Sequence, residues 1–444
     1  MAVLREIHTA WSRFGPATAL AAAGLLAAPA LVQDAVAQDQ EITIGVIYDF
    51  TGPFAAGGSE AAAIGTQIAI DMVNEQGGVE GYKITPIVAD AQSKAEVAIS
   101  EAERLLNQED VDLIMGIYSS AHCVPLAQKV DAQKEFMWAN VCTASAVFKD
   151  KDLHYVFRPQ VHTDQFGWAS CAFLQEASQE KLGVAPEELK VAIIYEDGPY
   201  GAGVALGNEV NCTEFGMEVV LKEGYAASTP DLSSLVTKLR RAQPDVILHT
   251  GYNPDITLFL RQAKEQGLRF QALIGHGAGY GQIDKLVEAF GEDVNYVYNV
   301  DPVAAQLLDP ATLAPGLGDL TAEMVERYKD QTGASEVPPH TSMGFNQTWV
   351  FLTDVLPRAI KDHGGFDPEA LRQAALETDI PDGGTIQGYG VKFFGPGTEM
   401  AGQNERSSPV VMQYIDGETN IAWPTKIQTA DPVLPLPSGH AYAP

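Results

Sequence analysis

The chain has 444 residues, of which 46% are hydrophobic and 19% are charged, a balance typical of an ordinary globular protein. Its formal net charge is −30, and so acidic a surface argues against nucleic acid or anionic lipid as a partner, because both attract Lys and Arg. The length is sufficient for two or more domains with cores of their own.

The first segment of the chain is predicted to be a cleaved export signal. Arg5 and Arg13 form a positive region, an apolar run from Ala17 to Val32 follows, and an A-x-A cleavage sequence ends at Ala37. The apolar run is shorter than the ~20 residues that a membrane span needs, so cleavage is favoured over a membrane anchor. We therefore expect an exported protein whose mature chain begins near Gln38 and carries no lipid anchor.

From residue 41 onward the sequence alternates between short apolar runs and amphipathic stretches. The apolar runs predict strands at Ile42–Tyr48, Lys83–Val88, Leu113–Gly116, Phe136–Ala139, Lys190–Tyr195, Glu218–Leu221, Val246–Thr250 and Ala272–Ile274. The amphipathic stretches predict helices at Ala61–Asn74, Ala95–Asn107, Leu320–Gln331 and Asn346–Lys361. This alternation is typical of an α/β fold, in which helices cover both faces of parallel sheets.

The order of these elements repeats coarsely along the chain. A block from about 41 to 160 has the same rhythm as one from about 190 to 300, which predicts two similar α/β lobes. The Pro-rich stretch Asp301–Gly318 interrupts the rhythm. Short β-like segments return at Val391–Phe394 and Val410–Asp416, and a Pro-rich tail ends the chain.

Four Cys in an exported protein suggest two disulfides, for which three pairings are possible. We expect Cys123–Cys142 and Cys171–Cys212, because each pair then stays within one predicted lobe. A zinc site is the weaker interpretation, since no C-x-x-C occurs and His122 beside Cys123 lacks further ligands at metal spacing. No metal site is therefore expected.

Motifs for catalysis are scarce. The sequence has no G-x-x-x-x-G-K-[ST] phosphate loop, no G-x-S-x-G elbow and no H-E-x-x-H pair. The stretch Gly275–Gly279 begins like a dinucleotide loop, but Tyr280 stands where the last Gly of G-x-G-x-x-G belongs. We expect a loop between lobes at this place, no cofactor and no enzyme; an exported hydrolase is the alternative.

Loops rich in hydroxyl groups, small residues and aromatic rings follow the predicted strands. They are Thr51-Gly52-Pro53-Phe54, Tyr118-Ser119-Ser120-Ala121, Asn140-Val141-Cys142-Thr143, Asp197-Gly198-Pro199-Tyr200 and Gly251-Tyr252. In parallel sheets such strand ends share one edge, where ligands bind, although the same residues also favour ordinary turns. Hydroxyls and helix-start N–H groups suit a carboxylate, and aromatic rings cover an apolar or cationic remainder.

Several segments carry a resemblance to a known family. They are IGVIYDFTGPFAAGG, AIDMVNEQGGVEGYKI, the Ser119-Ser120 loop, YEDGPYGAG at Tyr195–Gly203 and TGYNPDITLFLRQAKEQG at Thr250–Gly267. Over nearly the whole mature chain, the sequence resembles the leucine/isoleucine/valine-binding family of periplasmic solute receptors of ABC transporters.

The resemblance implies the type I periplasmic binding protein fold, with two Rossmann-like lobes joined by three crossover segments near 160, 300 and 390. The implied domains are a signal peptide at 1–37, an N-terminal lobe at 38–160 plus 301–390, and a C-terminal lobe and tail at 161–300 plus 391–444. The solute is expected to bind in the cleft between the lobes, which close by a hinge motion.

The family's ligand-binding residues carry over position by position. The hydroxyl that grips the solute carboxylate matches Ser120, the second hydroxyl matches Thr143, and the backbone group between them matches Val141. In the second lobe, the tyrosine that closes over the solute matches Tyr252, and another cleft tyrosine matches Tyr200.

One position departs from the family. Members that bind amino acids place Glu or Asp after the strand Ala272–Ile274 to pair with the solute ammonium, whereas this sequence has Gly277 there, beside His276. Because a buried ammonium without a partner is costly, an aromatic or short aliphatic acid is favoured as solute. Asp197 or Asp301 is the alternative partner, so a branched-chain or other amino acid is the alternative solute.

Aromatic side chains are expected to line the pocket, and the loop Thr51–Gly58 is expected to form one of its walls. The aromatic residues are Phe54, Tyr118, Tyr252, Tyr280 and Phe345. The predicted protein is a monomeric periplasmic receptor without cofactor, whose partners are a small solute and the permease subunits of an ABC transporter at the inner membrane. A periplasmic sensor for a small amide or acid, which signals to a kinase, is the alternative with the same fold.

Overall fold

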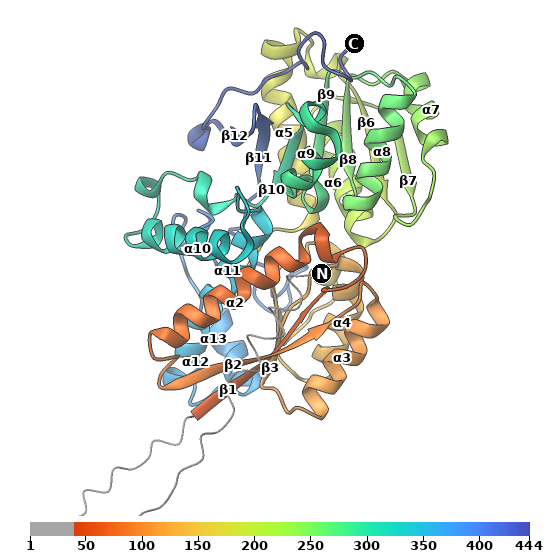
Figure 1. The fold of residues 1–444 in the computed structure, drawn as a ribbon. Coiled ribbons are helices and arrows are strands. Elements are labelled where there is room, and N and C mark those ends of the chain that lie inside the picture. The colour runs from red at the N-terminus through yellow and green to blue at the C-terminus, as the bar shows by residue number, and fades with distance from the viewer. Residues whose placement is uncertain (1–39) are drawn as a thin grey trace, which may run out of the picture. The chain divides into compact units, whose positions relative to one another are not determined.

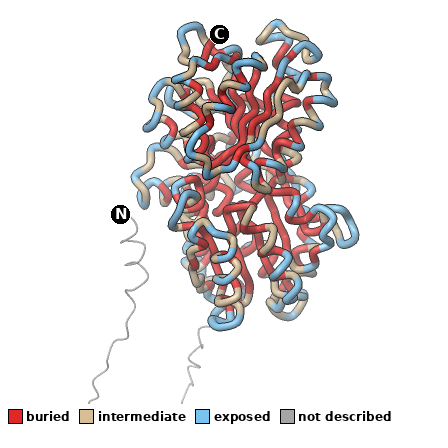
Figure 2. Tube along the Cα trace, turned by 90° about the vertical axis from the view of Figure 1, so that its right-hand side faces the viewer, coloured by how far each residue is buried: buried red, intermediate tan, exposed pale blue. Residues whose placement is uncertain are grey.

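Two β-sheets form the framework of the protein in the computed structural model, which describes residues 40–444. The predicted export signal at 1–37 lies outside the described residues. The strands are mostly buried, and the helices that cover them expose their outer faces (Figure 2). This layering is the α/β fold that the alternating sequence pattern predicts.

The first sheet has five parallel strands in the order β2-β1-β3-β4-β5. They are β1 (Gln40–Tyr48), β2 (Tyr82–Asp90), β3 (Leu113–Gly116), β4 (Met137–Ala139) and β5 (Val156–Phe157). The first four occur close to their predicted bounds. The sequence does not predict β5, because only two residues pair there with β4 and so short a run has no periodicity.

The second sheet has seven strands in the order β12-β11-β10-β9-β8-β6-β7. They are β6 (Lys190–Glu196), β7 (Glu218–Tyr225), β8 (Val246–Thr250), β9 (Ala272–His276), β10 (Tyr298–Asp301), β11 (Val410–Ile415) and β12 (Glu418–Trp423). β11 runs antiparallel to both of its neighbours, β10 and β12. The sheet is therefore mostly parallel, and at this edge a hairpin turn at Asp416 and Gly417 reverses the chain.

Twelve helices of the described residues cover the two sheets (Figure 1). They are α2 (Glu60–Glu75), α3 (Ala95–Asn107), α4 (Ser120–Gln133), α5 (Thr163–Ala177), α6 (Pro199–Glu214), α7 (Ser233–Ala242), α8 (Asn253–Glu265), α9 (Ile283–Phe290), α10 (Leu317–Thr332), α11 (Pro339–Val350), α12 (Leu356–Asp362) and α13 (Pro368–Leu376). Between residues 40 and 444, no helix has both the length and the apolar character that a membrane crossing requires.

After β10 the chain returns to the first sheet, where α11 packs along α2. The backbones of the two helices touch: a Cβ on Gly65 would lie 2.1 Å from the carbonyl oxygen of Thr341, and one on Gly344 would lie 2.0 Å from that of Ala62. Glycine is the residue that permits this approach, because every other residue carries a Cβ. This contact holds the returning segment to the first sheet.

The helix predicted at Asn346–Lys361 begins earlier in the structure and is interrupted. It starts at Pro339, because proline is favoured in the first turn of a helix, where its missing N–H costs nothing. A π-helical turn, η9 (Phe351–Val355), then separates α11 from α12. The earlier start matters, because it places the first turn of α11 beside the ends of the strands.

The third crossing between the sheets lies later than the predicted position near 390. Arg158 and the segment around Gly402 and Asn404 pair through backbone hydrogen bonds of 2.9 Å. The ring of Phe393 contacts Phe157, with centroids 5.1 Å apart. Residues 391–404 therefore stay with the first sheet, and the chain reaches β11 only after Asn404. The first two crossings follow β5 and β10, close to the predicted positions near 160 and 300.

Both disulfides have the pairing expected from the sequence. Cys123 in α4 is bonded to Cys142 after β4, and Cys171 in α5 is bonded to Cys212 in α6. The first bond joins the helix that follows β3 to the loop that follows β4. It therefore cross-links the two segments that carry the predicted carboxylate-binding hydroxyls.

Gly65→Ala is expected to lower the free energy of unfolding by about 1–3 kcal/mol, the usual cost of overpacking, because its Cβ would collide with the backbone of α11. Chemical denaturation followed by circular dichroism measures this. Gly395→Ala is the control, with an expected change within about 0.5 kcal/mol, because no atom lies within 4 Å of its Cβ position. Equal stability of the Gly65 variant and the unchanged protein would contradict the close helix contact.

Candidate functional site

A small cavity lies between the carboxyl ends of the strands of the two sheets, and we call it the inner chamber. Its lining residues are Tyr118, Ser120, Val141, Thr143, Phe166, Tyr200, Tyr252, Gly277, Ala278, Asp301, His340 and Met343. All predicted ligand-binding residues except Phe54 are among them. The cavity has a volume of about 30 Å³, so side chains fill most of the space between the lobes.

Two strand ends of the first sheet bring the predicted hydroxyls together. Ser120 is the first residue of α4 after β3, and Thr143 lies in the loop after β4. The Ser120 Oγ accepts hydrogen bonds from the backbone N–H groups of Thr143, at 3.2 Å, and Ala144, at 3.1 Å. The start of α4 adds the positive end of a helix dipole. This arrangement suits an anionic oxygen.

A buried cation, Arg158, supports the same loop from behind. Its Nη1 donates to the carbonyl oxygens of Cys142, at 3.0 Å, and Ala144, at 2.9 Å, which flank Thr143 in the sequence. Burial lowers the pKa of Arg158 to about 9, so the guanidinium is still charged at neutral pH. A cation in a low-dielectric interior favours a carboxylate bound in front of it. Arg158 is not among the residues predicted from the sequence, since a single Arg after a strand gives no signal.

Asp301 supplies a carboxyl group beside Gly277, the position at which the family carries an acid. β9 and β10 are adjacent, with Val300 opposite His276, so Asp301 at the end of β10 lies beside Gly277. Asp301 Oδ1 lies 3.2 Å from the position that a Cβ on Gly277 would take. The acid therefore comes from the neighbouring strand. Asp197, the other candidate, is exposed and is not part of the chamber lining.

The carboxyl group of Asp301 is strongly perturbed. Its side chain is 1% exposed, and its Oδ2 has no hydrogen-bond partner among the residues that the structure describes. Burial raises the pKa of Asp301 well above its usual value, and the neighbouring Asn299 amide only partly offsets this rise. Burial without a cation beside it therefore favours the protonated, uncharged form of this carboxyl group.

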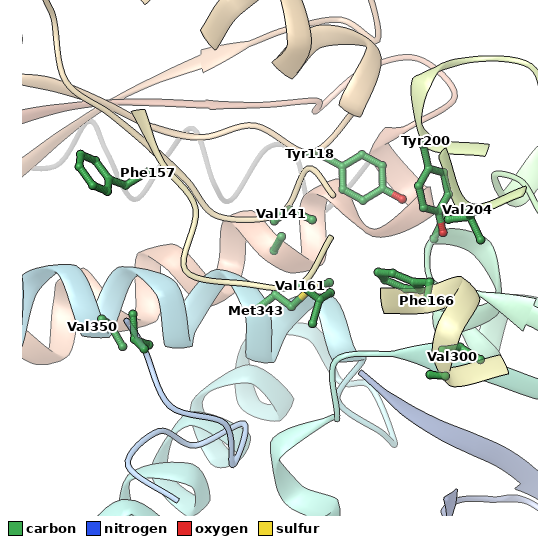
Figure 3. Close-up of a cluster of buried hydrophobic side chains, with 14 of the residues drawn as sticks. Tyr118, Val141, Phe157, Val161, Phe166, Tyr200, Val204, Val300, Met343 and Val350 are labelled. Carbon is green, nitrogen blue, oxygen red and sulfur yellow. The ribbon is translucent and has the colours of Figure 1, made fainter. Parts of the chain in front are cut away.

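Aromatic rings close the chamber. Tyr252 is the residue before α8, and its ring centroid lies 4.4 Å from that of Phe54 and 5.7 Å from that of Tyr200. The Tyr118 hydroxyl donates to the carbonyl oxygen of Gly57 at 2.6 Å, which ties the Thr51–Gly58 loop to the chamber. Figure 3 shows Tyr118 and Tyr200, two of the rings that line the chamber. Phe54 is therefore a neighbour of the chamber-lining rings, as expected of a wall residue.

Two of the predicted aromatic lining residues lie elsewhere. Phe345 is fully buried in a cluster with α2 and stacks on Trp349, with centroids 5.5 Å apart, because its position on α11 faces α2. The hydroxyl of Tyr280 forms a hydrogen bond of 2.6 Å with His249 Nδ1, outside the inner chamber. Both residues were expected in the pocket from composition alone, and the packing of their elements directs them away.

Four other lining residues were not foreseen: Ala278, which follows Gly277, and three residues on helices. Phe166 belongs to α5, and His340 and Met343 belong to α11, so they approach from helices rather than strand ends. Burial lowers the pKa of His340 to about 4, so its ring is neutral at pH 7. Its Nδ1 accepts a hydrogen bond of 3.0 Å from Gln282 Nε2, which links the two lobes. No local sequence signal marks these residues.

The chemistry of the chamber is that of hydrogen bonding and charge pairing. Within residues 40–444, no group of three or more His, Cys, Asp or Glu side chains is arranged as metal ligands. The pKa values of Tyr118, Tyr200 and Tyr252 are raised well above their usual value, chiefly by burial, so all three are neutral. Neutral donors, rings and one buried acid thus surround the space between the lobes.

Comparison with known proteins places this geometry in a family. Residues 41–412 match the family of periplasmic binding proteins. Leu/Ile/Val-binding protein homolog 7 of Brucella suis biovar 1 (strain 1330) is 34% identical over 411 residues, which cover 92% of this chain and 98% of that protein.

Solved structures agree in fold. The leucine binding protein LivK of Thermotoga maritima MSB8 has a TM-score of 0.71 at 23% identity, over 86% of this chain and 97% of that one. A fatty acid ABC transporter substrate-binding protein of Thermomonospora curvata has a TM-score of 0.69 at 18% identity, over 89% and 95%. By the extent of the sequence match, the chain belongs to the periplasmic binding protein family, which consists of solute receptors rather than enzymes.

Proposed function

We propose that the protein is the solute receptor of an ABC transporter and that it binds an α-amino acid between its lobes. The observation that carries this proposal is the pair of opposite binding elements on one chamber. Ser120 and Thr143 offer hydrogen bonds to a carboxylate from the first lobe, and Asp301 faces them from the second. An α-amino acid carries the two complementary charges on groups that are bonded to the same carbon atom.

The carboxylate end binds at the start of α4. The Ser120 and Thr143 hydroxyls and the N–H groups at the helix start donate to it, and Arg158 stabilises its charge through the loop. Hydrogen bonds to a charged group contribute about 1.5–3 kcal/mol each. The anionic end therefore determines the orientation of the solute.

The ammonium end binds at Asp301. The reason to expect a solute without an amino group was the glycine at position 277, and Asp301 removes that reason because its carboxyl lies beside Gly277. A cation near a buried carboxyl favours its ionised form, so binding transfers the Asp301 proton to solvent. The rings of Tyr118, Tyr200 and Tyr252 add a π-rich surround that also favours a cation.

Entry of the solute requires the lobes to part. The chamber volume of about 30 Å³ is far smaller than an amino acid, and the ring of Phe54 packs against the chamber-lining ring of Tyr252. Domain opening about crossover segments is the usual motion of such receptors. The relative named for Leu/Ile/Val binding and the solved receptor named for leucine make branched-chain amino acids the first ligands to test.

The cellular setting follows from the family and from the sequence. The predicted signal at 1–37 and the predicted disulfides suit export to an oxidising compartment, so we place the receptor in the periplasm. There it delivers its solute as a monomer to permease subunits at the inner membrane.

A second candidate is an aromatic or short aliphatic acid without an amino group. Asp301 favours it in one respect, since a protonated buried carboxyl donates a hydrogen bond to such a solute instead of pairing with a cation. One solved structure of the same fold is named for fatty acid transport. Thermal-shift measurements separate the two candidates: stabilisation by leucine or valine but not by benzoate would exclude this second one.

Ser120→Ala is expected to weaken solute binding by about 1.5–3 kcal/mol, because it removes a hydrogen bond to a charged group. Isothermal titration calorimetry with the stabilising solute measures the change. Ser178→Ala is the matched control: Ser178 is fully buried, but it does not line the chamber. Unchanged affinity of the Ser120 variant would show that this hydroxyl does not hold the solute.

Asp301→Asn is expected to stabilise the protein near neutral pH by about 1–3 kcal/mol, the scale of an uncompensated buried polar group, while it abolishes amino-acid binding. The direction of this change in stability follows from the linkage between proton binding and folding. The folded-state pKa of Asp301 is raised, so the folded protein keeps a proton that the unfolded chain loses above about pH 4, and stability falls as pH rises through that window. Thermal melts of both proteins at pH 4 and pH 7.5 test this, with the difference expected only at pH 7.5.

Amino-acid binding is expected to release a proton and to tighten as pH rises from 5 to 8. Both effects have one cause, because the ammonium favours ionised Asp301, whose pKa is raised in the solute-free protein. Calorimetry in two buffers of different ionisation enthalpy counts the released protons. Binding of leucine without proton release and without pH dependence would rule out an ion pair with Asp301.

A further inference from the structure

A second and larger cavity lies beside the inner chamber, and we call it the outer chamber. It has a volume of about 200 Å³ and is bordered by the segment Tyr280–Lys285, by strands β10 and β11, and by the loop before α11. It therefore also lies between the two lobes. None of the residues predicted to grip the solute carboxylate lines it.

The two chambers adjoin each other along β10. Asn299 lines the outer chamber and Asp301 lines the inner one. Residues two apart on a strand share a face and lie roughly 7 Å apart, and the Asn299 amide acts on the Asp301 carboxyl. A four-carbon side chain is long enough to span this separation.

A narrow partition separates the chambers elsewhere. The hydrogen bond between Gln282 Nε2 and His340 Nδ1 joins a residue of the outer chamber to a residue of the inner one. A Cβ on Gly281 would lie 3.1 Å from Asp301 Oδ2 and 3.2 Å from His340 Cε1. Gly281 therefore packs closely against both residues, and the absence of a side chain keeps this partition thin.

Two side chains of the outer chamber, Asn299 and Glu336, offer acceptor oxygens. The side chain of Asn299 is 9% exposed, and its Oδ1 has no hydrogen-bond partner within the described part of the chain. Glu336 is half-buried, accepts a hydrogen bond of 3.1 Å from Thr419 Oγ1, and has its pKa raised chiefly by burial. Asp284 and Lys285 also line the chamber, but both are exposed, and Lys285 pairs with Glu288 at 3.8 Å.

A buried acceptor without a partner favours a ligand that donates to it. We propose that the two chambers form one elongated site, and that the preferred solute is an α-amino acid whose side chain ends in a nitrogen donor. Asp301 pairs with the α-ammonium group, and the side chain passes Gly281. Its terminal N–H group then donates to Asn299 and Glu336. This inference rests on the proposed amino-acid binding and narrows its solute class.

L-lysine and L-norleucine form a matched pair of probes, because they differ by the terminal ammonium group at nearly the same length. L-glutamine and L-arginine are further probes whose side chains end in a nitrogen donor. In calorimetry on the full mature protein, we expect at least one of lysine, glutamine and arginine to bind tenfold more tightly than norleucine. Equal or tighter binding of norleucine than of all three would overturn the inference, while the proposed amino-acid receptor would stand.

Glu336→Gln tests the same inference by a change in the protein instead of the ligand. It is expected to weaken binding of the best donor-ended probe at least fivefold and to leave norleucine unchanged. Glu326→Gln is the matched control, since Glu326 is exposed on α10 and does not line the chamber. An equal loss for both ligands would overturn the assignment of Glu336, and binding of no amino acid at all would overturn the proposed function itself.

Discussion

The contact between the backbones of α2 and α11 is the constraint on which the site depends. Gly65 and Gly344 allow the two helices to touch, and this contact holds the returning chain against the first sheet. The first turn of α11 then carries His340 to the inner chamber, where it meets Gln282 of the second lobe. The returning segment thus belongs to the first lobe by packing, although it follows the second lobe in sequence.

The charges around the chamber form a second, electrostatic constraint. Arg158 lies buried behind the loop of Thr143, and Asp301 lies buried at the end of β10. A cation on the side of one lobe and an acid on the side of the other give the cleft a polarity that matches a zwitterion. Each group costs desolvation energy when it is alone, so the site is arranged at the expense of stability, as is common where a protein binds charged ligands.

In the proposed complex with an amino acid, the same polarity couples solute binding to the protonation of Asp301. Burial alone favours the protonated carboxyl group, and in that complex the solute ammonium takes the place of the proton. The aromatic rings remain neutral throughout, since burial raises their pKa values. By this proposal, closure on the solute and closure without it differ by one proton and one ion pair.

Much of the site could be predicted from the sequence, because a parallel sheet places every strand end at one edge. The loops after β3, β4, β8 and β9 supply Ser120, Thr143, Tyr252 and Gly277, all of which line the inner chamber. The disulfide pairing followed for a similar reason, since each pair lies within one lobe. The local sequence pattern was sufficient to predict a contact wherever the order of the strands determines which residues are neighbours in space.

The sequence by itself determined the alternation of strands and helices, the two lobes and the loops at the strand ends, because these follow from local periodicity. Only the tertiary structure decided that Asp301 occupies the place left by Gly277, since that depends on the pairing of β10 with β9. It also decided that Phe345 packs on α2 while His340 reaches the chamber. Both residues belong to α11, and the packing of α11 against α2 determines which of its side chains face α2. Long-range contacts of this kind leave no trace in the sequence around each residue.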